Sequence, residues 1–181
     1  MVKQASLLSG QELREMFAGA AAWLEKNAHD IDELNVFPVP DGDTGTNMLL
    51  TRRSSVEEAY RAPDNSASTV AKALAKGALL GARGNSGVIL SQIFRGMSED
   101  LEDKEVINGD NMAKALSKGS ETAYKALSDP VEGTILTVIK DASSAAIGKS
   151  ASDSKDLITV MEAVVKLLEN PSLILRHYSR Y

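Results

Sequence analysis

The chain has 181 residues and 43% hydrophobic residues, which suits one globular domain with a real core rather than a disordered segment. Its 25 acidic residues outnumber 20 basic ones, and no Lys/Arg run is long enough to follow a phosphate backbone, so we expect no nucleic-acid partner. Cysteine is absent and the two histidines, His29 and His177, lie far apart, which excludes disulfides and argues against a zinc centre.

The chain shows no export or membrane signal. Residues 1–9 lack a basic region followed by an apolar stretch of signal-peptide length, and nowhere do eighteen apolar residues run together. We therefore expect a cytoplasmic protein without a transmembrane segment.

Helical periodicity runs through most of the chain. Ser9 and Glu12 form a capping-box pattern before the first amphipathic helix, in which Trp23 is expected to pack. A second helix begins near Thr44 or Thr46 and runs to Tyr60. Further helices are predicted over 68–80, from 88 to 97, and over 110–127, 133–147 and 153–168.

No segment has the alternating pattern of a strand. The short apolar stretch 36–39 is interrupted by proline, so it is interpreted as an extended loop. Seven helices joined by short connections predict an all-α fold, an antiparallel up-and-down helical bundle or barrel.

An acidic loop before the second helix is the first candidate site. Asp41 and Asp43 flank a glycine, and two carboxylates so close are costly to hold together without a cation. Mg²⁺ prefers oxygen ligands, and Asn35, six residues earlier, can supply a third one. The alternative is that Asp41 and Asp43 are ordinary turn and helix-capping residues, since Asp-Gly is a frequent turn dipeptide.

The residues after this loop favour the metal interpretation. They add hydroxyls, an amide and a flexible backbone at a helix N-terminus, which is a natural place to hold phosphate. The residues concerned are Thr44, Gly45, Thr46 and Asn47.

A second candidate is the glycine-rich segment 81–87, interpreted as a loop between two helices. Its Gly84, Asn85, Ser86 and Gly87 offer backbone N–H groups and a hydroxyl to a phosphate, or form only a tight connection. Arg83 either contacts a phosphate or forms a surface ion pair.

A third candidate is the turn at 130–134. Its Thr134 precedes a helix and either caps that helix, which its residue type favours, or faces a ligand.

Three motifs together resemble a known family. LNVFPVPDGDTGTNM at 34–48, GARGNSGVILSQIFRG at 81–96 and KALSDPVEGTILTVIKDA at 125–142 are similar to the N-terminal domain of bacterial fatty acid kinases, which is related to the nucleotide-binding subunit of dihydroxyacetone kinases. The resemblance implies a barrel of about eight amphipathic helices that binds ATP or ADP with Mg²⁺ at one rim.

The resemblance also implies a role for each matched residue. Asp41 and Asp43 are the implied catalytic carboxylates and, with Asn35, the Mg²⁺ ligands. The implied nucleotide contacts are Thr44, Gly45, Thr46, Asn47, Gly84, Asn85, Ser86, Gly87 and Thr134. The dihydroxyacetone branch has histidine where this chain has Thr44, which favours the fatty acid kinase branch.

The implied activity is transfer of the γ-phosphoryl group of Mg-ATP to a fatty acid on a separate carrier protein, giving an acyl phosphate. A dihydroxyacetone-kinase-type phosphotransfer subunit and a non-catalytic nucleotide-binding fragment are the alternatives. The resemblance covers a domain at 1–170, whereas the tail 171–181 does not fit the family. This predicts a chain truncated at its C-terminus, and implies a homodimer formed through domains outside it.

Overall fold

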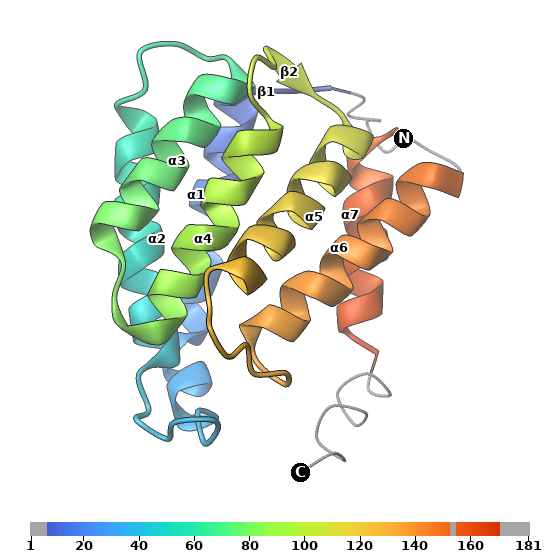
Figure 1. Cartoon of the computed structure of the whole chain (residues 1–181). Helices are drawn as coiled ribbons and strands as arrows, with labels where there is room; N and C mark the ends of the chain where they lie inside the picture. Colours follow the sequence, from blue (N-terminus) through green and yellow to red (C-terminus); the bar gives the residue numbers. More distant parts are fainter. Residues whose placement is uncertain (1–6, 153–154, 171–181) are drawn as a thin grey trace.

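The computed structural model describes residues 7–152 and 155–170, and their fold is all-α (Figure 1). The helices are α1 (Gly10–Glu33), α2 (Thr44–Tyr60), α3 (Ala67–Gly81), α4 (Gly84–Asp100), α5 (Gly109–Lys125), α6 (Ile135–Ser152) and α7 (Leu157–Leu168). Each helix packs against the next one in the sequence, and consecutive helices run in opposite directions. The predicted antiparallel up-and-down bundle is confirmed, with seven helices in the described residues.

Because consecutive helices run in opposite directions, successive connections lie at alternate ends of the bundle. The connections 34–43, 82–83 and 126–134 each follow an odd-numbered helix and meet at the lower end in Figure 1, which we call the loop end. The opposite end, which we call the strand end, carries the connections 61–66 and 101–108. The three motifs singled out in the sequence therefore all lie at the loop end.

A short strand pair, which the sequence pattern did not predict, lies at the strand end. The strands β1 (Leu8–Ser9) and β2 (Val106–Ile107) pair antiparallel, with Leu8 opposite Ile107. Backbone N–H groups of Ala67 and Ser68 also donate to carbonyls of the 101–108 connection, at 2.9 and 2.8 Å. The strand end is thus held by main-chain hydrogen bonds between segments distant in the sequence.

The start of α1 follows the predicted capping box. The Ser9 side chain accepts a hydrogen bond from the Glu12 N–H, and the Glu12 carboxylate accepts one from the Ser9 N–H at 2.8 Å. The buried face of the helix carries Leu13, Phe17 and Ala21, each four residues apart. Trp23, two positions after Ala21, points to the other side and is 70% exposed, so the expectation that it packs was wrong.

The remaining helix boundaries agree with the predictions to within a few residues, with one exception. The segment 81–87 is not a loop, because α3 continues to Gly81 and α4 already begins at Gly84. Gly81 is the last residue of α3, and a glycine fits there because the backbone passes close to Ser54: an added Cβ would lie only 2.2 Å from the Ser54 Cβ. The predicted helix start at Asp153 and the tail 171–181 lie outside the described residues.

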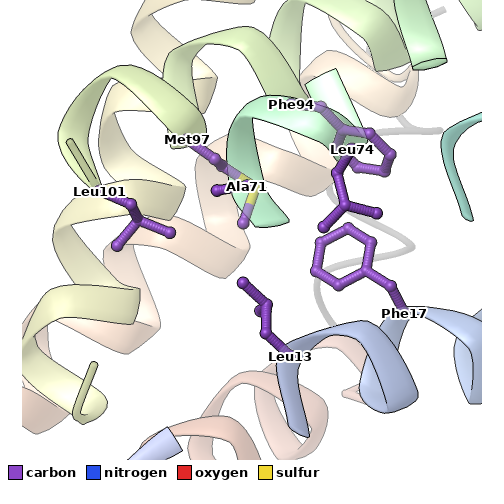
Figure 2. Close-up of a pocket in the computed structure, with 7 residues that line it drawn as sticks. All are labelled: Leu13, Phe17, Ala71, Leu74, Phe94, Met97 and Leu101. Carbon is purple, nitrogen blue, oxygen red and sulfur yellow. The ribbon is translucent and has the colours of Figure 1, made fainter. Parts of the chain in front are cut away.

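The core contains a small apolar space between α1, α3 and α4 (Figure 2). Its lining consists of Leu13, Phe17, Ala71, Leu74, Phe94, Met97 and Leu101, which are all apolar and buried. The Arg52 guanidinium lies 5.1 Å from the centre of the Phe17 ring and 5.9 Å from that of Phe94, and burial lowers the pKa of Arg52 to about 10. This part of the core positions the helices and is separate from the loop end.

Candidate functional site at the loop end

The acidic loop places its two carboxylates at the start of α2. Asp41 is exposed and Asp43 half-buried, and neither side chain makes a hydrogen bond or ion pair with the residues that the structure describes. Gly42 between them has a φ of 66°, a backbone conformation that glycine adopts without strain. Asp43 occupies the N-cap position of α2 yet forms no capping hydrogen bond, which argues against a simple capping role.

A residue outside the predicted site takes over that capping role. Asp32, in the last turn of α1, accepts hydrogen bonds from the Thr46 N–H at 3.1 Å and from the Thr46 hydroxyl at 2.6 Å. Partial burial alone would raise the pKa of Asp32, but the hydrogen bonds from Thr46 outweigh this effect and hold the pKa below its usual value. The first turn of α2 is therefore fixed to the end of α1.

Asn35 makes a second link across the acidic loop. Its side-chain oxygen accepts hydrogen bonds from the Thr44 hydroxyl at 2.9 Å and from the Asp43 N–H at 3.3 Å, while its Nδ2 donates to the Val39 carbonyl at 3.0 Å. Asn35 thus folds the loop back onto α2. A metal ion coordinated by this oxygen would have to share it with, or take it from, those two donors.

The start of α4 lies against the start of α2. The Ser86 hydroxyl donates to the Thr44 hydroxyl at 3.4 Å, and Arg83 at the N-cap position of α4 forms no side-chain capping bond. Gly84 has a φ of 56°, and a Cβ there would lie 2.3 Å from Nδ2 of Asn47. The structure therefore brings together the residues predicted from the first two motifs.

Thr51 is a second residue that the sequence did not indicate. It is fully buried, donates to the Asn47 carbonyl at 2.7 Å and accepts from the Arg83 N–H at 3.2 Å. A Cβ on Gly87 would lie only 2.3 Å from its hydroxyl oxygen. Thr51 thus joins α2 to the turn before α4, and the glycine allows that close approach.

The third motif lies at the same end but makes local contacts. The Thr134 hydroxyl donates to the Val131 carbonyl at 2.8 Å and accepts from the Leu136 N–H at 3.3 Å. This is the capping type of contact that its residue type favoured. Arg83, whose role was left open, donates from its guanidinium to the Ala82 carbonyl at 2.9 Å.

A polar network around Glu132 fixes this third connection. Glu132 accepts hydrogen bonds from the Thr137 hydroxyl at 2.7 Å, the Tyr124 hydroxyl at 3.0 Å and the Lys140 ammonium at 3.1 Å. The bond from Thr137, with those from Lys140 and Tyr124, lowers the pKa of Glu132, while burial and Glu132 raise the pKa of Tyr124 to about 12. The network joins the end of α5 to the start of α6.

This network predicts a pH-dependent contribution to stability. Because the folded-state pKa of Glu132 lies below its usual 4.5, its contribution is present above that value and is lost as the pH falls through the folded-state pKa. Glu132→Ala is expected to lower the free energy of unfolding by at most about 1 kcal/mol at neutral pH, because solvent screens this half-exposed side chain, and the difference should shrink as the pH falls through the folded-state pKa. Urea unfolding at several pH values checks this, and an unchanged difference at low pH would contradict it.

Groupings of histidine, cysteine, aspartate and glutamate give no ready-made metal site. Within the described ranges, no three such side chains gather closely enough to hold a metal ion. The loop end does offer the carboxylates of Asp41 and Asp43, which suit a hard cation completed by phosphate and water oxygens. No helix in the described part of the chain is long and apolar enough to cross a membrane.

Comparison with known proteins agrees with this helical domain whose polar motifs gather at one end. Residues 38–171 match the model of the DAK2 domain. The chain is also 48% identical over 174 residues to uncharacterized proteins of Staphylococcus aureus strains USA300, NCTC 8325 and COL, a match that covers 93% of this chain and 32% of each relative. The chain belongs to the DAK2 domain family, the nucleotide-binding, kinase-type domain of dihydroxyacetone-kinase-like proteins.

Proposed function

We propose that this chain binds Mg-ATP at the loop end and is the phosphotransfer domain of a kinase that phosphorylates a fatty acid held on a separate carrier protein. The observation that carries the proposal is the pair Asp41 and Asp43. Neither carboxylate has a partner among the described residues, and capping of α2 is done by Asp32 instead. Two unpaired carboxylates beside two helix N-termini suit a divalent cation that carries phosphate.

In the proposed site, Asp41 and Asp43 hold Mg²⁺, and Asn35 keeps the loop folded against α2. Bound Mg²⁺ would neutralise phosphate charge in the way common to kinases. The start of α4 offers its first backbone N–H groups, at Gly84, Asn85 and Ser86, to phosphate oxygens. The side chain of Arg83, at the N-cap position, does not cap them. Thr44 and Asn47, on α2, lie beside the start of α4. In this proposal the chain contributes by positioning the nucleotide and compensating its charge.

The proposed reaction follows from the resemblance of the three motifs to fatty acid kinases. A carboxylate oxygen of the fatty acid attacks the γ-phosphorus of ATP, and the bond from that phosphorus to the β–γ bridging oxygen breaks. The products are an acyl phosphate and ADP. The chain spans only about a third of the length of the curated relatives it matches. The fatty acid acceptor and its carrier protein are therefore proposed for the whole protein.

Calorimetry with Mg-ADP, followed by a phosphotransfer assay, tests the proposal. We expect one nucleotide per chain, with binding lost in EDTA, and acyl phosphate formed from ATP, fatty acid and its carrier in the presence of the whole protein. Absence of Mg²⁺-dependent nucleotide binding would contradict the site. Binding accompanied by turnover only with dihydroxyacetone and its partner subunit would contradict the fatty acid assignment, and binding without turnover would favour a non-catalytic module.

A further inference from the structure

Asp32 is the side chain that connects the end of α1 to the candidate site. Both of its oxygens are used, one by the Thr46 N–H and the other by the Thr46 hydroxyl. The backbones of α1 and α2 also approach each other closely at Gly45, next to Thr46, since a Cβ on Gly45 would lie 2.1 Å from the Ala28 carbonyl oxygen. The position of the first turn of α2 is therefore set by α1, through one carboxylate and one close backbone contact.

Hydrogen bonds to two side chains hold the acidic loop and the start of α2 in place. Asp32 accepts hydrogen bonds from Thr46, and Asn35 accepts hydrogen bonds from the Thr44 hydroxyl and the Asp43 N–H. Asp41, in contrast, is exposed and has no link of its own to the described residues. Loss of the Asp32 hydrogen bonds would free the Thr46 end of the first turn of α2 and leave Asn35 as the side chain that still accepts from Thr44 and the Asp43 N–H.

We propose that Asp32 is a positioning residue of the nucleotide site, whose carboxylate fixes the first turn of α2 so that Asp41 and Asp43 are presented to one metal ion. This inference rests on the proposed function. A consequence concerns Thr46, whose N–H and hydroxyl are already taken by Asp32. Phosphate oxygens are then received mainly at the start of α4, and Thr46 acts through Asp32 rather than by direct contact with phosphate.

A double-mutant cycle on the full chain, read by calorimetry with Mg-ADP, tests the inference. Asp32→Ala is expected to lower the affinity about 10-fold, within the range found for residues that orient metal ligands. Thr46→Val, which removes only the hydroxyl, should have a smaller effect, and the double variant should bind no more weakly than Asp32→Ala alone. Asp32→Asn should recover most of the affinity, since its amide oxygen still accepts from the Thr46 N–H.

Asp30→Ala is the matched control, because Asp30 lies on the same helix, is exposed, and its carboxylate has no partner among the described side chains. It should leave the affinity unchanged. An equal loss in Asp30→Ala and Asp32→Ala would overturn the inference, as would additive effects of Asp32→Ala and Thr46→Val.

Hydrogen exchange without nucleotide gives a second measurement that does not depend on binding. The Thr46 amide should exchange about 10-fold faster in Asp32→Ala than in the unmodified chain, because its acceptor is removed. Unchanged exchange would overturn the inference. Failure of the unmodified chain to bind Mg-ADP would overturn the proposed function, whereas normal binding by Asp32→Ala would overturn the role of Asp32 alone.

Discussion

Asp41→Asn and Asp43→Asn are each expected to weaken Mg-ADP binding about 100-fold, which corresponds to about 2.7 kcal/mol. Each substitution keeps the size of the side chain but removes a negative charge that the proposed metal requires. Neither carboxylate forms a hydrogen bond or ion pair with another described residue, so the free energy of unfolding should stay the same or rise slightly as their mutual repulsion is removed. Calorimetry and urea unfolding of the same samples measure both quantities.

Glu57→Gln is a matched control for charge. Glu57 is exposed on α2 and, among the described residues, has no hydrogen-bond or ion-pair partner. The substitution removes the same charge from α2, near the end of the helix that lies away from the acidic loop. Binding that falls equally in all three variants would indicate a general charge effect, and unchanged binding in Asp41→Asn and Asp43→Asn would contradict the metal site.

The second large effect is expected at Gly45, where α2 crosses α1. An added Cβ would lie 2.1 Å from the Ala28 carbonyl oxygen and 3.0 Å from the Ala28 Cα, so the two helices would have to move apart. Gly45→Ala is expected to lower the free energy of unfolding by about 3 kcal/mol. It should also weaken nucleotide binding, because Thr44 and Thr46 on either side would be displaced from Asn35 and Asp32.

Gly19→Ala provides the matched control for this substitution. Gly19 is also helical, but nothing lies within 4 Å of the Cβ that alanine would add. Alanine there should raise the free energy of unfolding by about 0.5–1 kcal/mol, because the unfolded chain loses conformational freedom. Urea unfolding of the two variants should therefore give shifts of opposite sign, and a stabilising Gly45→Ala would contradict the close helix contact.

Most of the fold could be predicted because its signals are local. The capping box at Ser9 and Glu12 and the four-residue spacing of Leu13 and Phe17 are readable without knowledge of the neighbours. The glycines of α3 and α4 were misinterpreted for the opposite reason. Gly81 marks a close approach to Ser54 on another helix, which resembles a loop signal when only the sequence is considered.

Contacts between distant segments were also invisible in the sequence. The pairing of Leu8 with Ile107 joins two-residue strands, too short to show any alternation. The acidic loop was recognisable from Asp41 and Asp43, because the two carboxylates are close together in the sequence. Asp32 was missed because its role depends on where α1 ends relative to α2, which only the packed structure shows.

The two ends of the bundle differ in the kind of hydrogen bond that joins one segment to another. At the strand end these bonds include backbone pairs, such as Gly10 with Asn65 and Ala67 with Glu105. At the loop end the links described above each use a side chain, as in Asp32 with Thr46 and Ser86 with Thr44. A point mutation can replace a side chain but not a backbone carbonyl. Substitutions can therefore change the specificity of the loop end, while the backbone hydrogen bonds of the strand end keep the helices in the same arrangement.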